Sequence, residues 1–455
     1  MTTPICDFVE RYRKRETARM HMPGHKGKGQ LGCEPWDITE ICGADALYEA
    51  DGIIAESEKN ASALFGTAAT LYSTEGSSQC IRAMLSLAVA RARRRGDAPR
   101  ILAARNVHKT FVYACALLDA EVRWLYPAAP CGLCSCPVTP AELEAALLRE
   151  KVRPAAVYVT SPDYLGRQQD IAGLAKVCGA HDVPLLVDNA HGAYLKFLPV
   201  SAHPIDLGAA ACCDSGHKTL PVLTGGAYLH LGAVCPEWTR EARGALALFG
   251  STSPSYLILQ SLDRCNRTLA EGYPARLRQC AARLAVLCET LQAAGCAVRQ
   301  PEPLKLVIDA APMGYTGCEL AALLRESEVE CEFADEDQLV LMAAPDNTER
   351  DFARVQAALC ALPARPARAE RVFEFLPAVP CMTLREAVFA PHEVLAVRQA
   401  VGRVCGSPTV SCPPAVPIAV SGETITAAHA DLFERYHISA VEVIAESFVS
   451  AQRQP

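Results

Sequence analysis

Four short segments carry side chains of the types that bind anions, hold protons or act as nucleophiles. They are Glu75-Gly76-Ser77-Ser78, Arg105-Asn106-Val107-His108-Lys109-Thr110, Val187-Asp188-Asn189-Ala190-His191-Gly192 and Asp214-Ser215-Gly216-His217-Lys218-Thr219. The first precedes a helical pattern, and free N–H groups at a helix N-terminus form an anion site. The third ends an apolar, β-prone run with an acid, and a buried carboxylate needs a charged or strongly donating partner. Taken singly, each segment could equally be a helix cap, a structural histidine or a surface lysine.

Together, the four segments meet the chemical needs of pyridoxal 5'-phosphate. Its phosphate requires a helix N-terminus with hydroxyls, which the first segment offers. Its ring nitrogen requires an acid such as Asp188 that keeps it protonated, so that the ring can withdraw electrons. Its aldehyde requires a lysine for a Schiff base, and its ring face suits a flat group such as an imidazole. The sequence therefore predicts a pyridoxal-phosphate enzyme.

The order and spacing of these segments resemble the ornithine/lysine/arginine decarboxylase family. The motifs that carry the resemblance are HMPGHKG (21–27), RNVHKT (105–110), VDNAHG (187–192) and SGHKTLP (215–221). TSPDYLG (160–166) and the C-terminal MTLREAVFA…PPAVPIAVSGE (382–423) extend it over most of the chain. The resemblance implies the aspartate-aminotransferase fold and the short, arginine-decarboxylase-like branch of the family.

The resemblance also implies a role for each of these side chains. Lys218 would form the Schiff base, Asp188 would pair with the pyridinium nitrogen, and His108 would stack on the ring with Ala190 beneath the other face. The remaining cofactor contacts would come from Gly76, Ser77, Ser78, Ser215 and His217, and the substrate contacts from Thr160 and the catalytic His191. No metal site is expected.

The implied reaction removes the α-carboxylate of arginine, lysine or ornithine and yields CO2 with agmatine or a diamine, as in polyamine biosynthesis. Either His191 or Lys218 could donate the proton to Cα, and an acid, for which Glu423 is one choice, should meet the distal cation of the substrate. Two alternatives remain at this point. One is another pyridoxal-phosphate reaction, catalysed by an aminotransferase or a lyase. The other is a catalytically silent homologue that regulates a true decarboxylase.

Several positions depart from the commoner pattern of the family. Asn189 replaces the acid of VDEAHG, and Asp163 and Leu165 alter the motif TSPTYYG. Glu75 stands where Asn is usual, and Thr224-Gly225-Gly226 replaces a Thr-Gln pair. All of these positions lie near the cofactor or substrate motifs, so they leave the choice of amino acid open.

Alternating strands and helices must position these residues. RILAAR (100–105), EVRWLYP (121–127), AAVYVT (155–160) and VPLLVD (183–188) are predicted strands, and helices are expected over 80–95, 141–150 and 170–182. This alternation predicts an α/β fold with a mostly parallel sheet sandwiched by helices, together with a smaller α/β domain and a C-terminal extension. The predicted domains are an N-terminal segment (1–50), a large cofactor-binding domain (51–280), a small α/β domain (281–370) and a C-terminal decarboxylase-type domain (371–455).

Composition limits the class of protein. The chain has 455 residues, 50% of them hydrophobic and 21% charged, which excludes a largely disordered protein. Its net charge of −7 argues against a nucleic-acid partner. The polar N-terminal sequence and the lack of a long apolar run predict a cytoplasmic protein without a membrane anchor, and the fold implies a homodimer or a higher oligomer.

Cysteine is unusually frequent, at 22 residues. In a reducing compartment, cysteines behave mostly as small buried hydrophobes rather than as disulfide partners. Cys131, Cys134 and Cys136 form the one suggestive cluster, but no second cysteine or histidine pair stands at zinc-site spacing. We therefore expect free thiols, and the role of this cluster is unassigned.

Overall fold

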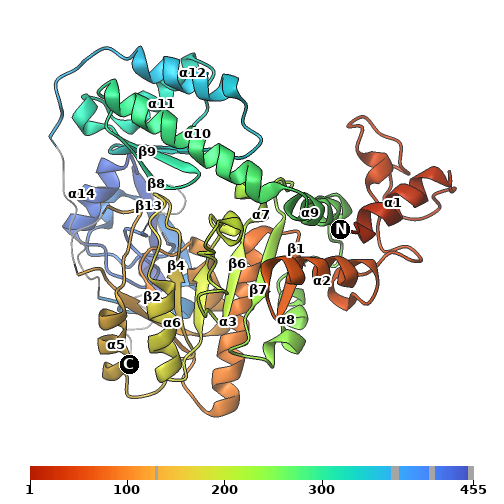
Figure 1. Cartoon of the computed structure of the whole chain (residues 1–455). Helices are drawn as coiled ribbons and strands as arrows, with labels where there is room; N and C mark the ends of the chain where they lie inside the picture. Colours follow the sequence, from red (N-terminus) through yellow and green to blue (C-terminus); the bar gives the residue numbers. More distant parts are fainter. Residues whose placement is uncertain (129–131, 370–378, 409–415, 449–455) are drawn as a thin grey trace. The chain divides into compact units, whose positions relative to one another are not determined.

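The computed structural model describes residues 1–128, 132–369, 379–408 and 416–448 (Figure 1). These residues form two compact units, each considered by itself below. The first unit comprises Met1–Ala103, Thr139–Ser161 and Gln169–Pro274, and the second comprises Ala104–Val138, Pro162–Gln168 and the described parts of Ala275–Pro455. The finer division into four domains stays a prediction.

The first unit is built on a mostly parallel sheet, as the sequence predicts. Its strands follow the order β1-β7-β6-β5-β4-β2, with the bounds β1 (Ala69–Ser73), β7 (Ala227–Leu231), β6 (Ala211–Asp214), β5 (Leu185–Asp188), β4 (Ala156–Thr160) and β2 (Arg100–Ala104). β2, β4, β5 and β6 run parallel to one another, and β7 runs antiparallel to both β6 and β1. The carboxyl ends of β4, β5 and β6 therefore meet at one edge of the sheet.

Helices bury this sheet. The helices of the first unit are α1 (Pro4–Lys14), α2 (Ile53–Phe65), α3 (Gly76–Arg95), α5 (Pro140–Arg149), α6 (Ile171–Ala180), α7 (Gly216–Thr219), α8 (Trp238–Ala247) and α9 (Tyr256–Ala270). α3 packs on β6 and β7, and α8 packs on α3 (Figure 1). All residues of β4, β5 and β6 are buried, which explains their nearly continuous apolar sequences. No helix in the described ranges is both long and apolar enough to cross a membrane.

The second unit holds a separate four-stranded antiparallel sheet. Its order is β10 (Phe333–Ala334), β11 (Gln338–Met342), β9 (Lys305–Asp309) and β8 (Val298–Glu302), and β12 (His392–Ala396) pairs with β13 (Ala440–Ile444). This unit also contains β3 (Glu121–Leu125), α4 (Lys109–Leu118), most of α10 (Tyr273–Ala293), α11 (Gly317–Glu326), α12 (Glu349–Cys360), α13 (Leu384–Phe389) and α14 (Ala427–Arg435). The further α/β region that the sequence predicts after the large sheet is therefore present, while its bounds as a domain stay a prediction.

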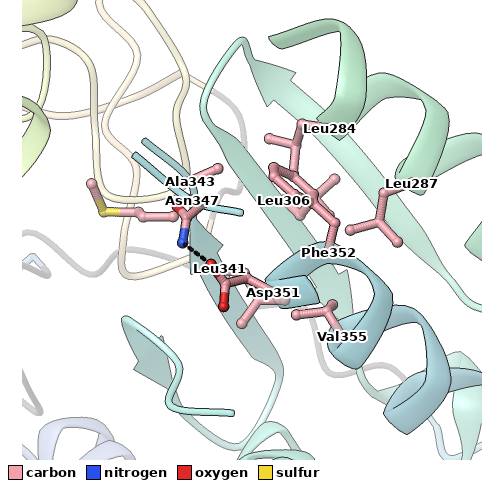
Figure 2. Close-up of a pocket in the computed structure, with 10 residues that line it drawn as sticks. Leu284, Leu287, Leu306, Leu341, Ala343, Asn347, Asp351, Phe352 and Val355 are labelled. Carbon is pink, nitrogen blue, oxygen red and sulfur yellow. Dashed lines mark hydrogen bonds between the residues drawn. The ribbon is translucent and has the colours of Figure 1, made fainter. Parts of the chain in front are cut away.

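The core of this second unit contains an apolar pocket (Figure 2). It lies among α10, β9, β11 and α12, and its lining includes Leu284, Leu306, Leu341, Phe352 and Val355. Its polar lining groups are the side chains of Asn347 and Asp351, which lie 3.5 Å apart. The lining therefore lacks the groups that the predicted chemistry needs.

The cysteines behave as the sequence predicts. Every cysteine among the described residues is a free thiol, and most are buried. Burial raises the pKa of the Cys178 and Cys265 thiols to about 12, so these thiols stay protonated at neutral pH. In the suggestive cluster, the thiol of Cys136 lies 3.3 Å from the backbone N–H of Arg105 and 3.4 Å from the carbonyl of Leu125, so it has a structural role. Cys131 lies outside the described residues.

Candidate active site

Asp188 stands at the carboxyl end of β5, and its side chain is 4% exposed. The hydroxyl of Tyr158 donates to Oδ2 at 3.2 Å, and the backbone N–H of Ala190 donates to Oδ1 at 3.2 Å. The thiol of Cys213, opposite Asp188 in the register of β5 and β6, lies 3.6 Å from Oδ1. Neutral donors thus hold this buried carboxylate, and no ion pair of Asp188 occurs within the described ranges.

Lys218 lies in α7, the short helix that follows β6. Its Nζ is 3.0 Å from Nε2 of His191, which is only 2% exposed. This approach follows from the sheet, because β5 and β6 are parallel neighbours and the turns after them meet at the same edge. The structure therefore places Lys218 beside His191, which lies in the turn that also carries Asp188.

Small hydroxyl residues gather at the start of α3. The sequence predicts that this helix begins at Cys80, but it begins at Gly76, so that Ser77 and Ser78 lie inside its first turn. The sequence pattern missed this turn because its residues are small and polar rather than periodic and apolar. The hydroxyl of Ser215 donates to Oγ of Ser77 at 2.9 Å. Backbone N–H groups of the first turn and three hydroxyls thus lie at a helix N-terminus that suits an anion.

Two neighbouring contacts fix the residues at which this helix begins. Gly76 has a φ of +73° and donates its N–H to the carbonyl of Gly225 at 2.7 Å. The carboxylate of Glu75, a departure from the family pattern, accepts from the N–H of Ser251 at 2.5 Å. The negative charge of Glu75 is therefore directed at the backbone of Ser251 rather than at an anion bound to the helix N-terminus.

The remaining predicted contacts of the first unit lie close by. Thr160 ends β4 directly opposite Asp188 in the sheet register and is 8% exposed. Ala190 follows Asp188 in the same turn and is also 8% exposed. Nδ1 of His217 lies 3.1 Å from the carbonyl of Gly226, which fixes the ring on the turn before Lys218.

His108 belongs to the second unit. It is the N-cap residue of α4, and its Nδ1 accepts a hydrogen bond from the N–H of Thr110 at 3.2 Å. A capping contact of this kind fixes the ring on the loop that follows β2. Its predicted stacking on the cofactor stays a prediction.

The loop that carries His108 is anchored by a buried ion pair that the sequence did not reveal. Arg105 donates Nη1 and Nη2 to the two carboxylate oxygens of Glu423, each at 2.7 Å, and both side chains are 2% exposed. The guanidinium also lies 4.7 Å from the ring centre of Trp124. Burial alone would lower the pKa of Arg105, but Glu423 raises it above its usual value. Because both oxygens of Glu423 are occupied, this geometry does not fit the expectation that Glu423 meets the substrate's distal cation.

Comparison with known proteins gives a consistent picture. Residues 3–292 match the family model described as Orn/Lys/Arg decarboxylase, major domain. The arginine decarboxylase of Bacillus subtilis is 29% identical to this chain over 462 residues, which cover 93% of this chain and 91% of the relative. The arginine decarboxylase of Bacillus anthracis is 28% identical with the same coverage of both chains.

Solved structures show the same fold at lower identity. The lysine decarboxylase LdcF of Francisella novicida superposes with a TM-score of 0.80 at 15% identity, covering 97% of this chain and 81% of that one. The constitutive lysine decarboxylase of E. coli gives a TM-score of 0.76 at 18% identity, covering 98% and 82%. A serine palmitoyltransferase of Sphingomonas wittichii is more distant, with a TM-score of 0.56.

The buried pair of Arg105 and Glu423 yields a stability prediction. Glu423→Gln leaves a buried guanidinium without its counter-charge, which we expect to cost about 3–5 kcal/mol of unfolding free energy. The matched control is Glu434→Gln, because Glu434 pairs with Arg398 on the surface, where the side chains are 47% and 54% exposed. That control should cost less than about 1 kcal/mol. Urea unfolding followed by circular dichroism measures both, and equal midpoints for the two variants would contradict the expectation.

Proposed function

This chain belongs to the Orn/Lys/Arg decarboxylase family and is a carboxy-lyase for a basic amino acid, and we propose that it decarboxylates arginine with pyridoxal 5'-phosphate bound between Asp188 and Lys218. The observation that carries the proposal is the convergence of a buried acid, a lysine and a histidine at the carboxyl ends of β5 and β6. The names of the relatives that align over nine-tenths of the chain favour arginine over lysine and ornithine. The family match does not favour an aminotransferase, another lyase or a silent homologue.

The residues present fit this cofactor. Asp188 is a buried carboxylate held by neutral donors, so a protonated ring nitrogen would supply the positive charge that such a group needs. The phosphate would be held by the N-terminus of α3 and the turn before α7, through Gly76, Ser77, Ser78, Ser215 and His217. We further propose that His108 stacks on the ring and that Ala190 lies beneath its other face.

When bound, pyridoxal phosphate supplies an aldehyde for the substrate amine and a ring that withdraws electrons from Cα as CO2 leaves. Lys218 would hold the cofactor through its side-chain amine. Asp188 keeps the ring nitrogen protonated and so stabilises the negative charge that develops during carboxylate loss. Thr160 contributes a nearly buried hydroxyl opposite Asp188 for the substrate or cofactor.

Proton delivery decides the outcome, because the amine product needs a proton at Cα in place of the lost carboxylate. Nζ of Lys218 and Nε2 of His191 are 3.0 Å apart, within reach of direct proton transfer. We therefore propose that this pair holds the proton and returns it to Cα. The burial of His191 keeps bulk water from competing for the same position.

The free thiols support a reducing compartment, and we propose that the enzyme works in the cytoplasm. There, the conversion of arginine to agmatine would supply polyamine biosynthesis. The acidic net charge of −7 also suits a protein whose substrate is a small cation.

The decisive experiment is a substrate panel. The purified protein, loaded with pyridoxal phosphate, is given arginine, lysine and ornithine, and CO2 and product mass are measured. We expect agmatine from arginine, with kcat/KM about 100-fold above that for lysine and ornithine. Polar groups of a site that bind one substrate are left without hydrogen-bond partners by another, which lowers kcat/KM for the latter. Lys218→Ala is the control and should release no CO2 and lose the visible absorbance of bound cofactor. Release of a keto acid, or no CO2 from any of the three, would refute the proposal.

We also propose that the chain forms a homodimer. Large apolar side chains near the N-terminus support an interface, since Met20 is 93%, Met22 is 68% and Leu31 is 86% exposed. Sedimentation equilibrium should give twice the chain mass of 48.8 kDa at micromolar concentration. A fully active species of single-chain mass would rule this out.

A further inference from the structure

A second cluster of polar side chains lies behind the candidate active site. Successive side chains of a strand point to opposite faces, so Cys213 shares a face with Asp188 while Cys212 and Asp214 point the other way. Asn189, the residue after Asp188, also turns away and donates its amide Nδ2–H to Oδ1 of Asp214 at 2.7 Å. The sheet thus separates the reactive side chains from a polar group on its other face.

Asp214 is the centre of this group. Its Oδ2 lies 3.1 Å from Nε2 of His203 and 3.2 Å from Nε2 of His230, and all three side chains are 0% exposed. Nδ1 of His230 lies 2.9 Å from the hydroxyl of Thr70. The carboxylate therefore has three donors within hydrogen-bond distance in a site without water access.

The charge state of this group follows from its surroundings. Burial alone would raise the pKa of Asp214, but His203 and His230 hold it well below its usual range, so the group is an anion. Burial lowers the pKa of His230, so its imidazole is neutral and donates through Nε2–H. The buried negative charge of Asp214 is thus held by His203 and His230 together with the amide of Asn189.

This anion connects two turns of the candidate active site. Asp214 immediately precedes Ser215, in the segment that leads to Lys218. Its hydrogen bond with Asn189 connects it to the turn that carries Asp188 and His191. A backbone hydrogen bond connects the same two segments, since the N–H of Asn189 donates to the carbonyl of Cys213 at 3.0 Å. Loosening Asp214 would therefore alter the separation of His191 and Lys218.

We propose that Asp214, held by His203, His230 and Asn189, is a positioning residue that fixes His191 against Lys218 from the opposite face of the sheet. The inference rests on the proposed function only for its effect on turnover. Asp214 touches neither substrate nor cofactor, so its contribution is geometric.

The test compares two buried carboxylates of the same unit. Asp214→Asn removes the central charge, and Asp263→Asn is the matched control, because Asp263 is also 0% exposed and accepts from Oγ–H of Ser57 at 2.6 Å and the N–H of Cys6 at 2.9 Å. Both variants should unfold at lower urea concentration. Only Asp214→Asn should lower kcat, by about 10- to 100-fold, with KM changed less than about threefold, as expected when reacting groups are misplaced.

A second readout requires no turnover. Protein with 13Cε1-labelled histidine gives one NMR signal for each of its 11 histidines, and the His191 signal is assigned by His191→Gln. In cofactor-free protein, Asp214→Asn should move the His191 signal and Asp263→Asn should not. This readout decides the positioning role even if the wild-type enzyme releases no CO2 from any basic amino acid.

A milder pair of variants covers the case in which Asp214→Asn does not fold. Asn189→Ala removes one contact to Asp214, and Asn266→Ala is its control, since Asn266 is equally buried and donates to the hydroxyl of Tyr72 at 2.7 Å. Only Asn189→Ala should move the His191 signal and lower kcat. Equal behaviour within each pair would overturn the proposal.

A bound metal ion would also overturn it, because the side chains of His203, Asp214 and His230 are of the kinds that bind metals. The contradicting result is one equivalent of tightly bound metal, measured by mass spectrometry and lost in His203→Gln.

Discussion

The parallel pairing of β5 with β6 is the constraint on which the candidate active site depends. In this register Asp188 lies opposite Cys213, so the turn after β5 and the turn after β6 leave the sheet side by side. A slip of one residue would send the Asp188 side chain to the other face, because side chains alternate along a strand. The continuous burial of both strands fixes the register, so the apolar sequence of the sheet also determines where the reactive groups lie.

The same alternation gives the sheet two different polar faces. One face presents Asp188 together with Tyr158 and Cys213, which are neutral donors and so leave the acid able to meet a cation. The other face holds Asp214 with donors that satisfy it fully. Two acids of similar burial therefore have different electrostatic surroundings, which are set by their partners rather than by their depth.

The second unit uses a long-range ion pair for a comparable purpose. Arg105 begins the segment that carries His108, and Glu423 lies 318 residues further along the chain. The pair fixes the start of this segment, and the cap on α4 fixes its end. His108 is thus held on a short loop that is restrained at both sides.

Much of this arrangement was predictable from the sequence, and the failures have physical reasons. The apolar run before Asp188 placed this acid at the carboxyl end of a strand, where parallel sheets present functional groups, and the family motif SGHKTLP singled out Lys218. The start of α3 was misplaced because small polar residues carry no helical periodicity. The partners of Arg105 and Asp214 could not be predicted, since no local pattern links residues so distant in sequence. The four-domain division and the stacking of His108 stay predictions.

The central claim is that Asp188 serves as the acid of a decarboxylase, and one variant tests it most directly. Asp188→Asn keeps the size of the side chain and can keep its hydrogen bonds to Tyr158 and Ala190, but it removes the charge. The measurement is CO2 release from arginine at saturating substrate, with bound pyridoxal phosphate determined in the same sample. We predict that the cofactor is retained while kcat falls by about 100-fold or more, the scale expected for loss of a preorganised electrostatic contact. A wild-type rate in that variant would contradict the account.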